Sequence, residues 1–182
     1  MIEIKRITEI TKNDINIPNE PFTLWGKMIP TYDGDEWAYS IEKFEESKIS
    51  EMVFPDENYD FDALNKDCFF IGAYNEFGKC VGLAIYRHDW LKYLYLDDLK
   101  VCKEYRGHGI GKLLLDEGKK MAADNGYRGI YTIVQDNNLS ACLFYIKSGF
   151  IVGGFNTHQY IGTNQADKSN IYLYLDGQNS FT

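Results

Sequence analysis

Residues 93–112 read YLYLDDLKVCKEYRGHGIGK, and this stretch decides the fold. Its first part alternates apolar side chains and predicts a strand over 93–101. Three glycines then fall within five positions, and behind them apolar residues recur every three or four positions until Asn125-Gly126. That spacing predicts a helix whose apolar face consists of Ile110, Leu113, Leu114, Gly118, Met121 and Ala122. A strand, a glycine loop and a helix therefore follow one another.

The glycine loop, R-G-H-G-I-G at 106–111, is suited to binding an anion. The first turn of a helix has backbone N–H groups without a helical partner and carries a partial positive charge. Glycine lets a phosphate approach closely, and Arg106 and Lys112 add positive charge at the two ends of the loop. We therefore expect a phosphate-bearing ligand here, while glycines that serve only a tight turn remain an alternative.

Two familiar phosphate motifs do not fit this spacing. A nucleotide-binding P-loop needs a hydroxyl residue after its lysine, and Lys112 is followed by Leu113. A dinucleotide site needs G-x-G-x-x-G in a parallel sheet, whereas the spacing here is G-x-G-x-G after strands that read as antiparallel. Nucleoside triphosphate chemistry and a Rossmann site are therefore disfavoured.

The pattern around this stretch predicts one domain with a mixed α/β sheet. Strands are expected over 2–7, 68–74, 80–88, 93–101, 129–135, 150–155 and 170–175. The strands between 68 and 101 are joined by short loops and read as an antiparallel meander. A helix is expected around 37–52, where Trp37, Ile41, Phe44 and Met52 would share a face, and a short one after residue 137 that ends at Gly149.

Charge divides the chain into an acidic and a nearly neutral part. Its 182 residues carry a net charge of −8. Residues 1–70 hold 16 acids against 7 bases, net −9, and residues 71–182 hold 11 acids against 12 bases, net +1. Such a surface repels nucleic acid and anionic lipid and attracts a cationic ligand. A solvated face that only aids solubility is the alternative.

The cysteines and the N-terminus indicate where the protein works. Cys68, Cys80, Cys102 and Cys142 stand singly without a C-x-x-C pair, which disfavours a zinc site or a disulfide framework. Neither a signal peptide nor a run of uncharged apolar residues long enough to cross a membrane is expected. A reduced cytoplasm fits this pattern, and no metal is expected.

Two ordered motifs resemble those of a known family. R-G-H-G-I-G matches the Q/R-x-x-G-x-G/A acetyl-coenzyme A signature of the GNAT superfamily of N-acetyltransferases. NNLSACLFYIKSGF (137–150) is similar to the second signature of that superfamily, an Asn, a Tyr seven residues later and then Gly-Phe. The resemblance covers residues 68–160 and implies a mostly antiparallel sheet of six to seven strands with flanking helices, and acetyl-CoA as co-substrate.

The resemblance also implies which residues bind the coenzyme. The loop amides would hold its pyrophosphate, and the backbone of 99–101 would pair with the pantetheine arm like an added strand. The implied coenzyme-binding residues are Leu99, Lys100, Val101, Arg106, Gly107, His108, Gly109, Ile110, Gly111, Lys112, Asn138 and Tyr145. Asn138 is also a natural N-cap for the helix behind it, and capping alone would explain it.

A narrower resemblance extends into the acidic part. PFTLWGKMIPTYDGDEW, taken with the motifs above, is similar to the streptothricin acetyltransferases, which acetylate the β-lysine portion of that cationic antibiotic. It implies one N-acetyltransferase domain over 1–182, with an acceptor-side region at 1–67 and an acetyl-CoA-binding core at 68–160. A different amine acceptor (an aminoglycoside, a polyamine, a protein lysine or N-terminus) and a non-catalytic acyl-CoA-binding module remain open, as does a homodimer.

The chemistry requires a base for the amine and a proton for the departing thiolate. Asp97 and Asp98 are the candidate bases; strand alternation places one on each side of the sheet, and we favour Asp97, which shares a face with Tyr95. A strand-edge acid with no catalytic role is the alternative. The resemblance implies that Tyr145 is the proton donor, and a core aromatic is the alternative for it.

The acceptor-binding residues are expected in the acidic part. Carboxylates beside aromatic faces suit an ammonium or guanidinium-like ligand. The candidates are Asp33, Asp35, Glu36 and Trp37. We expect the partner to be a cationic small-molecule amine.

Overall fold

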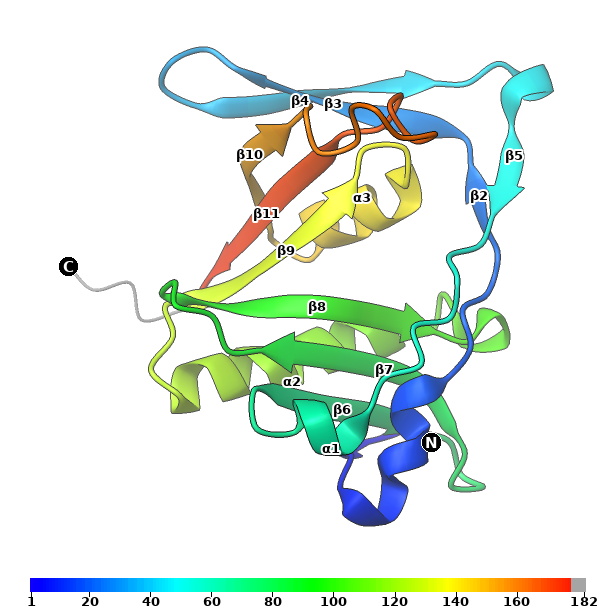
Figure 1. The fold of residues 1–182 in the computed structure, drawn as a ribbon, viewed down its shortest axis with the longest axis vertical. Helices are drawn as coiled ribbons and strands as arrows, with labels where there is room; N and C mark the ends of the chain where they lie inside the picture. Colours follow the sequence, from blue (N-terminus) through cyan, green and yellow to red (C-terminus); the bar gives the residue numbers. More distant parts are fainter. Residues whose placement is uncertain (178–182) are drawn as a thin grey trace. The chain divides into compact units, whose positions relative to one another are not determined.

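The strand, glycine loop and helix at the centre of the sequence form as predicted. Strand β8 (Tyr93–Val101) is followed by the short 3-10 turn η3 (Lys103–Tyr105), the glycine loop and helix α2 (Ile110–Asp124). The computed structural model describes residues 1–177 (Figure 1). Two compact units are present, one made of 1–20, 54–130 and Gly177, the other of 21–53 and 131–176.

The first unit is an antiparallel sheet with helices on both faces. It contains β1 (Glu3–Arg6), η1 (Glu9–Asn16), α1 (Phe61–Leu64), β6 (Cys68–Tyr74), β7 (Cys80–Arg87), β8, η3 and α2. Its strands lie in the order β1-β6-β7-β8, and each neighbouring pair is antiparallel (Figure 1). The predicted meander over 68–101 is therefore confirmed.

The second unit contains three further main strands and two separate two-stranded sheets. It contains β2 (Phe22–Leu24), β3 (Gly26–Tyr32), β4 (Trp37–Lys43), η2 (Glu46–Lys48), β5 (Ser50–Met52), most of β9 (Gly129–Gln135), α3 (Leu139–Lys147), β10 (Ile151–Asn156) and β11 (Asn170–Asp176). β9, β11 and β10 lie in that order, and β2–β5 and β3–β4 are antiparallel pairs. The seven main strands are therefore β1, β6, β7 and β8 in the first unit and β9, β10 and β11 in the second. They confirm the expected mostly antiparallel α/β sheet of six to seven strands.

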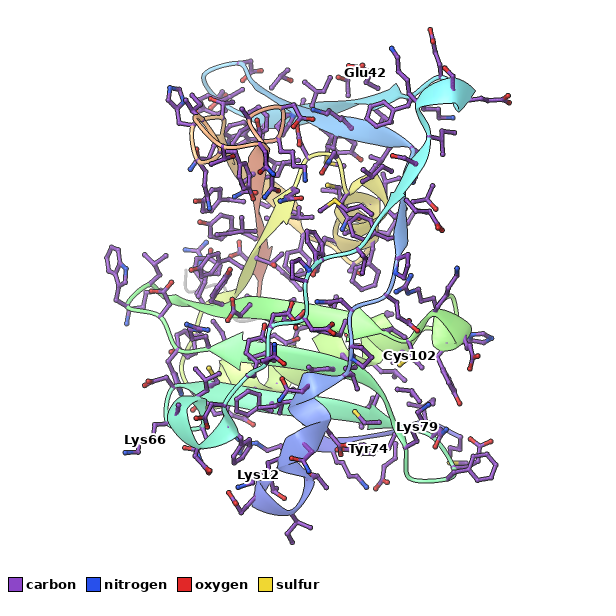
Figure 2. All side chains as sticks on the ribbon, turned by 45° about the vertical axis from the view of Figure 1, so that its right-hand side comes forward. Lys12, Glu42, Lys66, Tyr74, Lys79 and Cys102 are labelled. Carbon is purple, nitrogen blue, oxygen red and sulfur yellow. The ribbon has the colours of Figure 1, made fainter. Side chains whose placement is uncertain are left out.

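Alternation along β7 divides the core of the first unit into two layers. Leu83 and Ile85 pack with Ile7 and Ile15 of the N-terminal segment, and all four are fully or almost fully buried. Residues of the other parity face α2, where Ile110 lies against Gly82. Tyr74, labelled in Figure 2, donates its hydroxyl proton to Asp14 Oδ2 at 2.8 Å and so ties η1 to β6.

The buried face of α2 differs from the expected one at one position. Ile110, Leu114, Gly118, Met121 and Ala122 are buried as predicted. Leu113 is 43% exposed, and Leu115 is buried in its place. The helix ends as expected, because Gly126 takes a left-handed conformation (φ +73°) after the last turn.

Gly118 allows α2 to approach β7 closely. A Cβ atom built at this position would lie 2.1 Å from the ring of Tyr86. The hydroxyl of Tyr86, which is fully buried, donates to the carbonyl oxygen of Leu114 at 3.1 Å. The ring is therefore held in the place that a side chain at 118 would need.

We expect Gly118→Ala to lower the free energy of unfolding by about 1–3 kcal/mol, because the methyl group overpacks this contact. Chemical denaturation of the variant measures the loss. In a Tyr86→Leu background the same substitution should cost less, since the ring is gone. An equal loss in both backgrounds would show that Tyr86 is not the cause.

The expected helix around 37–52 is wrong. Residues Trp37–Lys43 form strand β4, which pairs with β3 through a turn at Asp33-Gly34 in which Gly34 has φ +107°. The apolar residues Trp37, Tyr39 and Ile41 alternate, as a strand requires. A Gly after Asp between two such runs is a hairpin signal. Strand β4 is almost entirely exposed, and Glu42 on it is labelled in Figure 2.

Packing in the second unit joins α3 to β3. A Cβ at Gly26 would lie 2.7 Å from Leu139, so glycine permits this contact. Trp25 donates its indole N–H to Ser140 Oγ at 2.8 Å. In the part of the chain that the structure describes, no helix is long and apolar enough to cross a membrane.

Candidate active site

The glycine loop presents a row of backbone N–H groups. Gly107 and Gly109 take left-handed conformations (φ +78° and +80°), and Gly109 is the N-cap of α2. Within residues 1–177 the N–H groups of 107–112 donate to no other group of the chain. A Cβ at Gly107 or Gly109 would meet open space. The loop therefore fits a phosphate of acetyl-CoA, because consecutive free N–H groups at a helix N-terminus bind anions.

The two cations at the ends of this loop are engaged by neighbours. Arg106 donates from Nε to the carbonyl oxygen of Val101 at 2.9 Å, and its guanidinium lies 3.6 Å from Glu20. Lys112 pairs with Asp116 one turn along α2 at 2.8 Å. His108 lies on the exposed side of the loop. The backbone rather than these side chains thus supplies the arranged donors.

A β-bulge in β8 places both candidate bases on one face. Tyr86 pairs with Leu96 and Ile85 pairs with Asp98, so the ladder skips Asp97. The extra residue breaks the alternation that the sequence implied. Asp97 contacts Arg87, which shares the Ile85 face, at 2.5 Å. The expectation that Asp97 and Asp98 face opposite sides of the sheet is therefore wrong.

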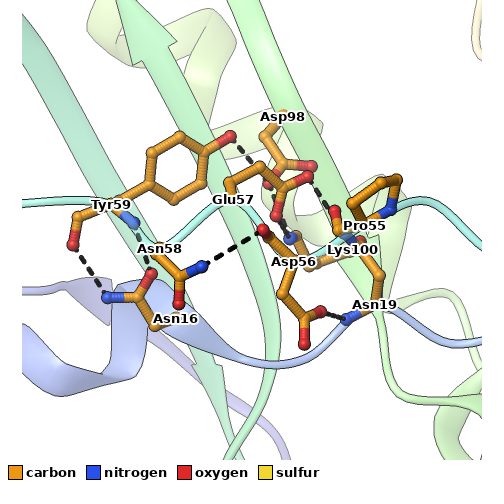
Figure 3. A network of polar contacts seen from close by, with 9 residues as sticks. All are labelled: Asn16, Asn19, Pro55, Asp56, Glu57, Asn58, Tyr59, Asp98 and Lys100. Carbon is orange, nitrogen blue, oxygen red and sulfur yellow. Dashed lines mark hydrogen bonds and ion pairs between the residues drawn. The ribbon is translucent and has the colours of Figure 1, made fainter.

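Asp98 belongs to a network that sequence reasoning missed (Figure 3). Its Oδ2 lies 2.9 Å from Lys100 Nζ and accepts a hydrogen bond from the Tyr59 hydroxyl at 3.4 Å. Lys100 also pairs with Glu57 at 2.8 Å. The side chains of Asp98 and Lys100 are only 15% and 11% exposed. One cation is thus shared by two carboxylates under the segment 54–60.

The segment that covers this network is fastened by side-chain hydrogen bonds (Figure 3). Asn16 both donates to the carbonyl oxygen and accepts from the N–H of Tyr59, at 2.9 and 2.7 Å. Asn19 donates to Glu57 at 3.0 Å, and its N–H donates to Asp56 at 2.6 Å. These contacts hold Glu57 and Tyr59 over β8.

Burial and charge shift the pKa values in the network. Burial raises the pKa of Asp98, and the neighbouring charges of Glu57 and Asp97 add to this, while Lys100 opposes it. Burial alone would lower the pKa of Lys100, but its two carboxylate partners outweigh it and the pKa is raised. The pKa of Tyr59 is raised well above its usual range, first by burial and then by Asp98. Asp98 is therefore the more basic carboxylate of its network.

The second motif of the sequence builds helix α3. Asn138 is its N-cap, and the side-chain oxygen accepts a hydrogen bond from the N–H of Ala141 at 3.3 Å. Gly149 follows the C-cap Ser148, and its left-handed conformation (φ +95°) turns Phe150 back onto Tyr145, with ring centroids 5.2 Å apart. Tyr145 is 7% exposed and also packs edge-on against Phe144. The Asn and Gly-Phe flanks thus fix the position of Tyr145.

The acidic candidates for acceptor binding lie at the tip of the β3–β4 hairpin. Asp33 accepts hydrogen bonds from the N–H groups of Asp35 and Glu36 at 2.9 and 2.8 Å, so its carboxylate shapes the turn. Those hydrogen bonds, from Glu36 first, lower the pKa of Asp33. The ring of Trp37 packs against that of Tyr32 in a tilted arrangement, with ring centroids 5.1 Å apart. Asp35 and Glu36 are exposed.

The structure gathers the predicted residues into three groups. Asp97, Asp98 and Lys100 lie together on β8 in the first unit, which also carries the glycine loop. Asn138 and Tyr145 lie on α3, and the acidic candidates lie on the hairpin, both in the second unit. Glu57 and Tyr59 could have been suspected only from the acids around them, because no motif marks their segment. No cluster of potential metal ligands occurs among the described residues.

Comparison with known proteins agrees with this geometry. The model of the acetyltransferase (GNAT) family matches residues 35–150. Streptothricin acetyltransferase A of Bacillus subtilis is 33% identical over 171 residues, which is 94% of this chain and 98% of that protein. A streptothricin acetyltransferase of Escherichia coli is 28% identical over 66% of this chain and 69% of its own.

Solved structures extend the likeness to the fold. A structure from Bacillus anthracis, described as a streptothricin acetyltransferase in complex with acetyl coenzyme A, superposes with a TM-score of 0.85 at 26% identity. It covers 97% of this chain and 98% of its own. The nourseothricin acetyltransferase structure, at 23% identity and a TM-score of 0.78, shares the fold over 96% of this chain and 98% of its own. The family match over most of the chain, together with the open N–H groups of the glycine loop, shows that this chain belongs to the GNAT family and is an acetyl-CoA-dependent acetyltransferase.

Proposed function

We propose that the enzyme acetylates a primary amine of a cationic small molecule, the β-lysine portion of streptothricin, and so detoxifies the antibiotic. One observation carries this proposal: the relative from Bacillus subtilis is similar over 94% of this chain and 98% of its own, so the match extends into the acidic part where an acceptor would bind. The exposed acids of the hairpin suit a cationic acceptor.

In this proposal the first unit holds the coenzyme. The N–H groups of 107–112 bind its pyrophosphate, with Gly107 and Gly109 leaving space for it. The backbone of Leu99, Lys100 and Val101 pairs with the pantetheine arm. The bound coenzyme supplies an acetyl thioester. The single domain over 1–182, divided near residue 67, and the cytoplasmic location remain predictions.

Asp98 is proposed as the group that removes a proton from the acceptor amine. Asp97 is engaged by the guanidinium of Arg87. Burial raises the pKa of Asp98 although Lys100 opposes this, and a raised pKa suits a group that accepts a proton. Tyr145 donates a proton to the departing sulfur, and the packing of its ring fixes where its hydroxyl lies.

Release of free thiol from acetyl-CoA tests the proposal. The purified protein is incubated with streptothricin, an aminoglycoside, a polyamine and a lysine peptide. Streptothricin should give the highest kcat/KM. Preference for another amine would replace the substrate while keeping the reaction, and no release with any amine would contradict the proposed acyl transfer.

The role of the acidic hairpin is tested by neutralising the two exposed carboxylates at its tip, Asp35 and Glu36. We expect Asp35→Asn with Glu36→Gln to raise the KM for streptothricin about fivefold, because exposed charges each contribute little. Asp33 is left intact, since its carboxylate builds the turn. The KM should also rise with salt in the parent and less so in the variant.

A matched control is Glu45→Gln with Glu46→Gln, which changes the net charge of the same unit equally. It should leave the KM for streptothricin unchanged. An equal rise in both double variants would mean that overall charge, not the hairpin tip, attracts the acceptor.

A further inference from the structure

Two buried amide oxygens at the end of β9 lack a hydrogen-bond partner. They are Gln135 Oε1 and Asn137 Oδ1, and no group among residues 1–177 donates to either. Asn137 is only 4% exposed. A buried acceptor without a donor destabilises a fold. Two of them within three residues therefore favour donors supplied from outside the chain, such as a ligand or an ordered water.

The side-chain nitrogen of Gln135 is engaged by a network of neighbouring side chains. Gln135 Nε2 donates to the Tyr160 hydroxyl at 3.0 Å. That hydroxyl in turn donates to Asn170 Oδ1 at 3.1 Å, and Asn170 Nδ2 donates to Gln159 Oε1 at 2.8 Å. Because the hydroxyl proton of Tyr160 is used on Asn170, it must accept from Gln135. The amide nitrogen therefore points into the network, and the oxygen is left over.

The backbone on which both amides stand is rigidly held. The N–H of Asp136 donates to the carbonyl oxygen of Ser169 at 2.9 Å, and Asp136 Oδ1 accepts from the N–H of Ser169 at 3.1 Å. The carbonyl oxygen of Asp136 also accepts from the N–H of Met28 at 3.0 Å. Asn138 then caps α3. The backbone that carries the two amides is thus preorganised, as a binding site requires.

We propose that Gln135 and Asn137 bind N–H donors of the acceptor substrate, from an ammonium or amide-type nitrogen. The inference rests on the proposed function and names the residues that recognise its acceptor. The side-chain oxygen of Asn or Gln can only accept a hydrogen bond, so its partner must carry an N–H or O–H proton. The coenzyme phosphates, in contrast, need donors, which the glycine loop offers, and the amide N–H groups of the pantetheine arm are already assigned to the backbone of 99–101 in the proposed function. A site of this kind selects substrates by hydrogen bonds and tolerates salt, unlike the acidic hairpin.

Asn137→Leu and Asn137→Asp form the decisive pair of variants. Leucine removes the oxygen at similar size, so the KM for the acceptor should rise about tenfold while the KM for acetyl-CoA stays unchanged. Aspartate keeps an acceptor oxygen and should retain the parent KM. The melting temperature of the leucine variant should be equal or higher, because an unpaired buried oxygen has been removed. Gln135→Met should behave like Asn137→Leu.

A measurement on the unmodified protein covers the case in which a variant does not fold. The side-chain NH₂ resonances of Asn137 and Gln135 should shift on titration with the accepted amine in the absence of acetyl-CoA. An unchanged acceptor KM in Asn137→Leu, or resonances that move only with acetyl-CoA, would overturn the inference. Thiol release by the parent enzyme separates this inference from the proposed function. If streptothricin is acetylated but the variants and resonances do not behave as expected, only the inference about Gln135 and Asn137 is wrong. If no amine is acetylated, the proposed function and the inference are both wrong.

Discussion

Replacing Asp98 with Asn should lower kcat/KM for the acceptor by about 10²–10⁴-fold, the range that a positioned general base contributes. The amide fills the same space and still accepts from Tyr59 and Lys100, but it cannot take a proton. Thiol release under acceptor-limiting conditions measures the loss. The KM for acetyl-CoA should change little, because the coenzyme is proposed to contact β8 through its backbone.

The pH dependence separates a base from a merely structural acid. Only the ionised form of Asp98 can accept a proton, so kcat/KM should fall as pH drops through its raised pKa. Glu57→Gln removes a negative charge that raises this pKa, and the acidic limb should move to lower pH. Lys100→Met removes the cation that opposes the rise, and the limb should move to higher pH.

Asp97→Asn serves as the matched control for Asp98→Asn. Asp97 is ion-paired with Arg87, and its loss should reduce activity less. Because the charge of Asp97 also raises the pKa of Asp98, the acidic limb should move to lower pH, as with Glu57→Gln, while most of the activity is kept. If Asp97→Asn instead caused the larger loss, or if the Glu57 and Lys100 variants left the limb unmoved, the assignment of Asp98 as base would be wrong.

Local signals explain which parts of the fold could be predicted. Strands 68–74 and 93–101 and the end of α2 were predictable because alternation, short turns and Asn125-Gly126 act between neighbours in sequence. The helix predicted over 37–52 was wrong because Trp37, Ile41 and Phe44 satisfy a helical spacing by chance, while the hairpin turn that determines the structure lies upstream. The turn residues Asp33-Gly34 therefore indicated the local structure better than the apolar spacing within 37–44 did.

The site was harder to predict, because it depends on contacts that are distant in sequence. The bulge at Asp97 arises from how β8 pairs with β7, and nothing in YLYLDDLKV marks it. Glu57 reaches Lys100 across 43 positions of the chain. The glycine loop, in contrast, is a local motif, and the left-handed Gly107 and Gly109 are where the sequence placed them.

Tyr145→Phe should lower kcat by about 10²-fold or more while leaving the KM for acetyl-CoA close to that of the parent enzyme. Phenylalanine keeps the edge-on contacts with Phe144 and Phe150, so the fold should be retained and the melting temperature nearly unchanged. What is lost is the hydroxyl proton that the departing sulfur needs. Single-turnover thiol release measures the chemical step directly.

The leaving group itself distinguishes a proton donor from a core aromatic. An acetyl aryl thioester releases a thiol of low pKa, which departs without a proton. With this donor Tyr145→Phe should lose much less rate than with acetyl-CoA, because the missing proton is no longer required. Phe144→Leu, which disturbs the same packing without touching the hydroxyl, should lose equally with both donors. An equal loss with both donors for Tyr145→Phe would assign Tyr145 to packing alone.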